Sequence, residues 1–307
     1  MIEIQQCLVC GAEKTNFKFV FELSDCWLKV DNIKYKIFQC QNCKIAFLNP
    51  RPDDMELVKY YTNEFDKFYN TTDKDLIKKY SFTLQKKYKL LPEKKGKILD
   101  IGAQKGEFLE YCKRRGWTVE GIELTNTIPN PYNLPIKYGN FLDINYPENY
   151  FDVITLWHVI EHLPHPHLII EKISKILKLQ GLLILAMPNF NSLNLQFMNA
   201  EDIPRHLFFF NLDSISFLLN KFGFSIIEYN YHSGVHKNSI SGLITFLIKR
   251  NILKMDKEEL LHLYHNYPKK FENIFFKIID RSITLPLRLI LPYLKKSHNF
   301  YIIAAKN

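Results

Sequence analysis

The chain has 307 residues, 47% of them hydrophobic, which is enough to bury the core of one large domain with a smaller one beside it. Its 41 Lys and Arg exceed its 32 Asp and Glu, and the net charge of +9 favours an anionic small molecule, nucleic acid or membrane face as partner. The basic residues are spread along the chain, which favours a solvated surface over a nucleic-acid groove. No apolar run reaches the roughly 20 residues of a membrane span and the N-terminus lacks a signal-peptide pattern, so we expect a cytoplasmic protein.

Two Cys-x-x-Cys pairs stand near the N-terminus: Cys7, Cys10, Cys40 and Cys43. Each pair can place two thiolates on one tight turn, and four thiolates satisfy tetrahedral zinc without leaving an open position for catalysis. Aromatic and β-branched residues at 17–23 and 35–38 predict short strands between the pairs. The sequence therefore predicts a zinc ribbon over residues 1–52 with a structural metal, in preference to a redox dithiol.

A helical linker is predicted over residues 53–95. Asp53 or Asp54 can cap a first helix, and a second helical pattern at 73–91 ends before a proline.

The segment 97–108 reads KILDIGAQKGEF and carries the strongest signal in the chain. An apolar run at 98–101 predicts a strand, which leads through a glycine-containing turn into a helical pattern at 107–115. A second apolar run at 117–122 ends at Glu123. This order of strand, turn, helix, strand and acid is typical of a nucleotide-binding α/β sheet, in which the carboxylate accepts the ribose hydroxyls.

The alternation continues to the end of the chain. Further strands are predicted at 135–141, 152–157, 182–187, 224–231 and 300–305, with helices at 158–179 and 213–222. Strands that alternate with helices indicate an α/β fold with a doubly wound, Rossmann-like parallel sheet and helices on both faces. Ligands then lie beyond the carboxyl ends of the strands.

The glycine spacing distinguishes between cofactors. The turn lacks both the GxGxxG pattern of nicotinamide dinucleotide sites and the GxxxxGK[ST] pattern of Walker-type loops. It resembles the first motif of class I S-adenosylmethionine-dependent methyltransferases, an acid, one residue and a GxGxG-like loop. Asp100, Gly102 and Gly106 match that motif, and Gln104 stands where the family usually has its middle glycine.

The resemblance extends over most of residues 5–231 and the final strand. Gly-Asn at 139–140 resembles the family's Gly-Asp at the adenine, and 150–164 looks like its FDVV…HVLEH segment. PRHL at 204–207 and the ribbon end at 47–52 resemble one branch of the family. That branch includes zinc-ribbon sugar C-methyltransferases and methyltransferases of polysaccharide gene clusters, and is related to quinone O-methyltransferases.

The resemblance implies a methyltransferase domain over 96–307 and a set of donor-binding residues. These are Asp100, Gly102, Gln104, Gly106, Glu123, Leu124, Asn140, Phe141 and Trp157. Glu123 is expected to accept the ribose hydroxyls, and Asp100 to hold the turn and favour the cationic sulfonium end. Leu124 and Phe141 are expected to flank the adenine.

On the acceptor side, His158 and His206 are the candidate bases, needed only if the acceptor must lose a proton. Arg205 is expected to grip an acceptor diphosphate or carboxylate. A Glu/His metal site in the segment with His158, Glu161 and His162, as in some quinone methyltransferases, is an alternative for which the sequence offers no clear third ligand.

The predicted function is S-adenosylmethionine-dependent methyl transfer to a hydroxyl or activated carbon of a sugar nucleotide or glycan intermediate. Two alternatives stay open. One is an RNA methyltransferase, although the sequence shows no aromatic and lysine stripe for a nucleic acid. The other is a catalytically degenerate scaffold or binding protein, suggested by Gln104.

Residues 232–297 form a helical insertion before the last strand. It has apolar runs flanked by lysines, which favour a lid packed on the sheet or on a second subunit of a homo-oligomer. The alternative is peripheral membrane contact through 240–294 that brings the enzyme to a lipid-linked acceptor.

Overall fold

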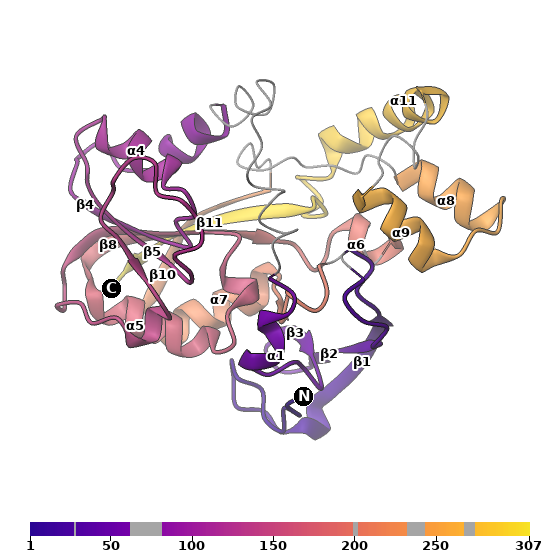
Figure 1. The fold of residues 1–307 in the computed structure, drawn as a ribbon, viewed down its shortest axis with the longest axis horizontal. Helices are drawn as coiled ribbons and strands as arrows, with labels where there is room; N and C mark the ends of the chain where they lie inside the picture. The colour runs from indigo at the N-terminus through magenta and orange to yellow at the C-terminus, as the bar shows by residue number, and fades with distance from the viewer. Residues whose placement is uncertain (28, 62–81, 199–201, 232–242, 267–273) are drawn as a thin grey trace.

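The computed structural model describes six stretches of the chain, shown in Figure 1: 1–27, 29–61, 82–198, 202–231, 243–266 and 274–307. Of the helix predicted at 73–91, residues 82–88 are helical and the part before 82 lies outside the described residues. The apolar runs of the insertion also fall partly outside them.

Seven strands form the central sheet, in the order β10-β11-β8-β7-β4-β5-β6. Their bounds are β4 Lys97–Ile101, β5 Thr118–Glu123, β6 Ile136–Tyr138, β7 Phe151–Trp157, β8 Leu177–Pro188, β10 Phe224–Asn230 and β11 Asn299–Lys306. The strands from β4 to β8 pair in parallel, whereas β11 runs antiparallel between β8 and β10. The predicted α/β sheet is confirmed, with this one antiparallel strand as the difference.

Helices cover both faces of the sheet. On one face lies α4 (Glu107–Lys113), and on the other lie α5 (Pro166–Ile176) and α7 (Leu212–Lys221), as Figure 1 shows. Short helical turns follow β6 and β7, namely η2 (Phe141–Asp143) and η3 (Ile160–His162). Buried isoleucines of α5, such as Ile169 and Ile173, pack into the core beneath the sheet.

The helix predicted at 158–179 is wrong at both ends. It begins at Pro166, whose fixed φ suits the first helical turn, and His158 at φ +58° cannot continue a right-handed helix. It ends at Ile176 because Leu177 is buried and pairs with Phe151, so β8 starts before Gly181.

The N-terminal residues form a second, antiparallel sheet in the order β1-β2-β3-β9. Its strands are β1 Phe17–Leu23, β2 Tyr35–Cys40, β3 Ala46–Leu48 and β9 Phe208–Phe209, after a short turn η1 at Lys14–Asn16. The first two strands were predicted, but β3 and β9 are too short to leave a periodic signal. The helix α1 (Asp54–Val58) follows, and Asp53 caps it through a reciprocal contact with Glu56.

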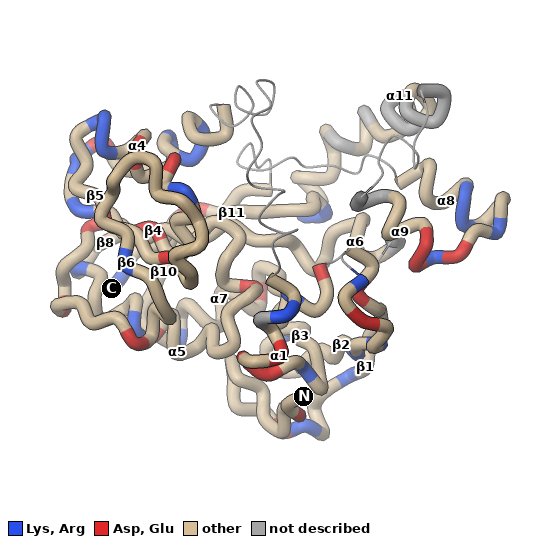
Figure 2. The backbone as a smooth tube through the Cα atoms, viewed as in Figure 1, with Lys and Arg blue, Asp and Glu red and all other residues tan. Residues whose placement is uncertain are grey.

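Among the described residues between β8 and β11, the further helices are α6 Leu193–Met198, α8 Leu243–Asn251, α9 Lys257–Asn266 and α11 Ile274–Ile290. The last three belong to the predicted helical insertion and extend away from the sheet in Figure 1. Within the described stretches, none of the helices has the length and apolarity that a bilayer crossing requires. Figure 2 shows Lys and Arg distributed over many elements with Asp and Glu between them.

Candidate active site

The turn between β4 and α4 has the left-handed backbone that its glycines allow. Gly102 and Gly106 have φ values of +76° and +80°, and Gln104 between them has φ +49°. A Cβ atom on Gly102 would lie 2.4 Å from Cγ2 of Val159, so glycine is also required by the packing there. The N–H groups of Gly102 and Ala103 donate to the Ile122 carbonyl at 2.8 and 2.9 Å, which fixes the turn to β5.

Glu123 closes this turn from the end of β5. Its Oε2 accepts the Gln104 N–H and its Oε1 accepts the Leu124 N–H, both at 2.8 Å. Burial raises the pKa of the carboxyl, and the two hydrogen bonds counteract that rise. The structure thus brings together Gln104 and Glu123, as the sequence predicts, and leaves Leu124 65% exposed beside them.

Asp100 lies beneath the turn, fully buried, and accepts a hydrogen bond of 2.5 Å from the Thr155 hydroxyl. Burial raises the pKa of Asp100 to about 7. Lys87 of the 82–88 helix interacts with this carboxylate, and loss of water around its ammonium group lowers the pKa of Lys87 to about 8. Lys87 could not be identified from the sequence, because one lysine in a lysine-rich helix carries no signal.

The remaining predicted donor residues differ in exposure. Trp157 is buried, with its ring 5.3 Å from Phe108 and the Lys87 ammonium 4.8 Å above it. Phe141 is part of the hydrophobic core. Asn140 caps η2 by accepting the Leu142 N–H at 3.0 Å. Asn140 and Phe141 follow β6 at the same carboxyl edge of the sheet as Glu123, and their contact with adenine stays a prediction.

His158 and Glu161 meet just beyond the end of β7. His158 has a left-handed backbone at φ +58°, and its N–H donates to the Ala186 carbonyl at 2.8 Å. Its Nδ1 lies 3.3 Å from Oε1 of Glu161, which is only 1% exposed. Burial opposes ionisation of Glu161, but the facing His158, with His162 and His206 nearby, holds its pKa below the ordinary value. Beyond this contact with His158, neither carboxylate oxygen accepts a hydrogen bond from the residues that the structure describes.

His162 and His206 complete a cluster with Glu161. One ligand atom from each lies within 4.8 Å of the others, and the two imidazole rings are 4.7 Å apart. His162 Nδ1 lies 3.0 Å from the Arg205 carbonyl, and burial lowers the pKa of His162 to about 4. Neutral imidazoles and a carboxylate are ligands of divalent transition metals. His206 thus completes a group of three residues that could hold a metal, and the sequence could not identify it as the third.

Arg205 lies inside the fold. Its side chain has no exposed surface, and its guanidinium pairs with Asp202. Nη1 also donates to the Tyr60 carbonyl at 3.3 Å, and the group lies 5.0 Å above the Trp27 ring. An acceptor anion would have to displace Asp202 to reach Arg205, so this placement favours a role in holding the loop.

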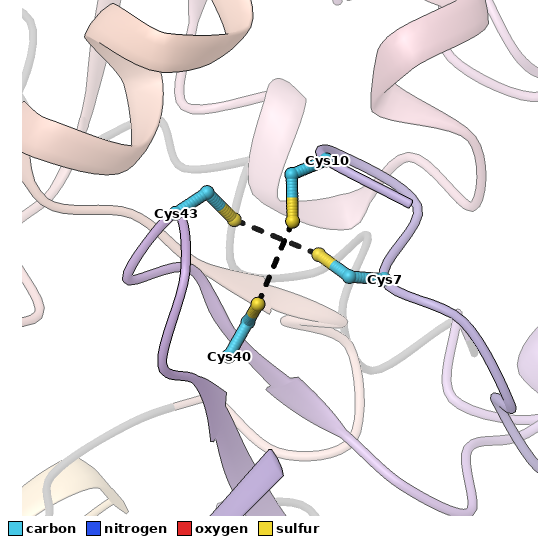
Figure 3. Close-up of side chains that lie close together, drawn as sticks. All are labelled: Cys7, Cys10, Cys40 and Cys43. Carbon is cyan, nitrogen blue, oxygen red and sulfur yellow. Dashed lines mark hydrogen bonds between the residues drawn. The ribbon is translucent and has the colours of Figure 1, made fainter. Parts of the chain in front are cut away.

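The four predicted metal-binding cysteines converge on one point, as Figure 3 shows. Cys7 and Cys43 have their Sγ atoms 3.6 Å apart, as have Cys10 and Cys40. The hydrogen bond between Cys7 and Cys43 lowers the pKa of Cys7 and raises that of Cys43, so Cys7 is the thiol of this pair that ionises first. The donor set fits tetrahedral zinc.

Comparisons with known protein sequences identify methyltransferases as relatives of this chain. A model of the methyltransferase domain family matches residues 61–229. A ubiquinone biosynthesis O-methyltransferase of Actinobacillus pleuropneumoniae is 32% identical over 110 residues, which cover 30% of this chain and 46% of that protein. Another, of Bartonella tribocorum, is 33% identical over 110 residues, which cover 33% of this chain and 44% of that protein. The chain therefore spans less than half the length of these curated relatives.

Solved structures share the fold. A SAM-dependent methyltransferase of Archaeoglobus fulgidus superposes with a TM-score of 0.51 at 20% identity, covering 80% of this chain and all 100% of that one. A chain from the complex of the Haloferax volcanii Trm112 methyltransferase activator with a methyltransferase also gives 0.51, at 13% identity, with 78% and 95% covered. The family model spans more than half of the 307 residues, and the chain therefore belongs to the methyltransferase domain family, with the class I S-adenosylmethionine-dependent fold.

Proposed function

We propose that this protein transfers a methyl group from S-adenosylmethionine to a small-molecule acceptor. The observation that carries the proposal is Glu123 at the end of β5, whose carboxylate faces the left-handed turn between β4 and α4 and accepts only two N–H groups from the described residues. A carboxylate has about four acceptor positions, so two ribose hydroxyls can still donate to it. The exposed Leu124 beside it offers an apolar surface for the adenine.

The methionine end of the donor carries both an ammonium and a carboxylate group. Asp100, directly before the turn, and Lys87, which interacts with it, carry the complementary charges. When bound, S-adenosylmethionine supplies a methyl group activated on its sulfonium. The residues of the chain then align the donor and acceptor, which is the larger part of catalysis for such a displacement.

For the acceptor we propose a hydroxyl or activated carbon, with a sugar nucleotide or glycan intermediate as the substrate class. The resemblance of the ribbon and the PRHL element supports the sugar class. The relatives named as ubiquinone biosynthesis O-methyltransferases support a hydroxyl as the methylated group. His158 or His206 would take the acceptor proton, a role that typically contributes about 10²–10⁴ to the rate.

A divalent metal bound by Glu161, His162 and His206 is a second candidate feature of the acceptor side. The supporting observation is the buried Glu161 carboxylate, which beyond its contact with His158 accepts no hydrogen bond within the described part of the chain and has ligand atoms of His162 and His206 within 4.8 Å. A metal there would polarise an acceptor hydroxyl and lower its pKa.

Isothermal titration with S-adenosylhomocysteine tests donor binding. We expect micromolar binding by the wild type and its loss in Glu123→Ala. Glu120→Ala is the matched control, because Glu120 lies on the same strand and has no hydrogen bond to the turn among those identified. Equal binding by all three proteins, or none by the wild type, would refute the proposal.

A labelling experiment tests the acceptor class. The enzyme is incubated with methyl-labelled S-adenosylmethionine and separate pools of nucleotide sugars, quinone-containing lipids and RNA. Label in the nucleotide-sugar pool supports the proposed class. Label in the quinone pool alone would refute the sugar class and indicate a quinone hydroxyl as the acceptor. Label in the RNA alone would refute it in favour of the RNA methyltransferase alternative.

A further inference from the structure

Leu207 connects the cysteine module (residues 1–52) to the histidine cluster (Glu161, His162 and His206) through its own backbone. Its N–H donates to the Glu161 carbonyl at 2.9 Å, and its carbonyl accepts the Leu48 N–H at 3.1 Å. Leu207 is fully buried and directly follows His206 in the chain. A buried residue with both backbone groups bonded has little freedom to move.

The contact continues along the ladder between β3 and β9. Ala46 pairs with Phe209, and Phe47 pairs with Phe208, in antiparallel register. Beyond the ladder, the Asn211 side chain donates to the carbonyl of Lys44 at 3.3 Å. Lys44 directly follows Cys43, so the second cysteine pair and β9 are joined by one short strand.

Arg205, on the other side of His206, is also tied to the N-terminal part of the chain. Its guanidinium lies over Trp27 and donates to the Tyr60 carbonyl. Both sequence neighbours of His206 therefore have partners in the first 60 residues.

The donor turn has separate supports. Gly102 and Ala103 are held by the Ile122 carbonyl, and Glu123 bonds to Gln104. Within the described part of the chain, these hydrogen bonds tie the turn to β5. A strand of two residues such as β9 has almost no intrinsic stability and depends on its partner strand.

We propose that the cysteine module is a positioning element for His206. It acts through the β3–β9 ladder, with Leu48 and Leu207 as the positioning residues. Loosening the four-cysteine centre then displaces His206 and lowers turnover, while the donor site keeps its affinity. The predicted fall in turnover rests on the proposed methyl transfer. The predicted displacement of His206 does not depend on the reaction.

Two variants and a matched control test the proposal in the full-length, zinc-loaded protein. Cys43→Ser removes one thiolate of the centre. Leu48→Pro removes the N–H that donates to Leu207, together with a buried leucine side chain of β3, and changes no cysteine or histidine. Cys26→Ser is the control, since Cys26 is a buried cysteine of the same module outside the four-cysteine cluster.

The first measurement is amide hydrogen exchange, and the second is turnover compared with S-adenosylhomocysteine affinity. Loss of one backbone hydrogen bond should accelerate exchange in the segment 205–209 by about two- to tenfold. We expect this acceleration in both variants, a fall in kcat, and a donor Kd within about twofold of the wild type. Cys26→Ser should match the wild type in all three.

Unchanged exchange at 205–209 in both variants would overturn the proposal. So would equal acceleration at the donor turn, 102–106, because the module would then support the whole fold. If Leu48→Pro does not fold, stepwise chelation of zinc from the wild type provides the same comparison. Failure of the wild type to bind the donor would refute the proposed function alone, since the exchange result would still stand.

Discussion

The Glu161 carboxylate lies 3.3 Å from Nδ1 of His158, with His158 directly after β7 and Glu161 within η3. The φ value of +58° at His158 is rare outside glycine, and such backbones are most often found at functional sites. The buried charge of Glu161 is shared among His158, His162 and His206. This contact joins the end of β7 to the acceptor-side cluster.

Glu161→Gln keeps the shape of the side chain and removes its charge. We expect bound manganese to be lost and kcat to fall by about 10² or more, because the carboxylate either binds the metal or balances the base. Electron paramagnetic resonance of added manganese measures this site without counting zinc at the cysteines. Glu171→Gln, on the exposed side of α5, is the control. Full manganese binding by Glu161→Gln would show that the cluster is not a metal site.

His158→Ala and His206→Ala separate catalysis from donor binding. Replacing the true base should lower turnover by about 10²–10⁴ and leave the affinity for S-adenosylhomocysteine nearly unchanged. Turnover assays and calorimetry on the same preparations measure both. Near-normal turnover in both variants would mean that alignment alone suffices. A parallel loss of donor binding would place that histidine in the donor site or the core.

The pH dependence of donor binding follows from Asp100 and Lys87. The pKa of Asp100 is raised to about 7, so its charge, which attracts the cationic donor, is lost as the pH falls below that value. The pKa of Lys87 is lowered to about 8, so its charge for the donor carboxylate is lost above it. We expect S-adenosylmethionine affinity to peak between the two values in calorimetric titrations. Asp100→Asn should flatten the acidic side and Lys87→Met the alkaline side, and a profile unchanged in both would contradict this assignment.

Asp100 also links stability to pH. Its folded pKa lies above the ordinary value of 3.8, so the unfolded chain loses this proton first and the folded protein loses stability as the pH rises from about 4 to 7. Urea denaturation of the wild type and of Asp100→Asn should diverge across that window. A constant difference from pH 4 to 7 would show that Asp100 ionises normally.

Gly102→Ala tests the close approach of the donor turn to Val159. The left-handed backbone alone costs about 1 kcal/mol with alanine, and the added Cβ at 2.4 Å from Val159 adds about 1–3 kcal/mol of overpacking. Gly223→Ala is the matched control, because its φ of +79° is nearly the same and no atom lies within 4 Å of its Cβ. Urea denaturation compares the two. Equal destabilisation of the two variants would mean that the Val159 side chain moves aside without measurable cost.

The four-cysteine centre should hold about one zinc per chain, the number that four thiolates can bind. Elemental analysis of the wild type measures this directly. Cys10→Ser should lower the zinc content and the thermal midpoint together, whereas Cys112→Ser, a cysteine of α4 outside the cluster, should keep the zinc. A metal-free protein with four readily titrated thiols and unchanged stability would refute the zinc assignment.

Local patterns in the sequence determined the α/β class, the glycine turn with its acid and the four-cysteine set. Each can be recognised from residues within one strand, turn or helix, or from a residue type that has few other uses at such spacing. None of them requires knowledge of tertiary contacts. The strand-by-strand alternation likewise predicted the central sheet, because buried parallel strands must be apolar along their length.

Only the tertiary structure decided how these parts meet. The two residues of β9 show no periodicity, and they form a strand because β3 offers open hydrogen-bonding groups. His206 joins Glu161 and His162 through the return of a distant loop, and Asp202 and Trp27 draw Arg205 inward. The pKa of Lys87 is lowered because its ammonium group loses water beside Asp100. Such features arise from pairing between remote segments and from the removal of water around charges. Neither effect can be predicted from a local sequence pattern.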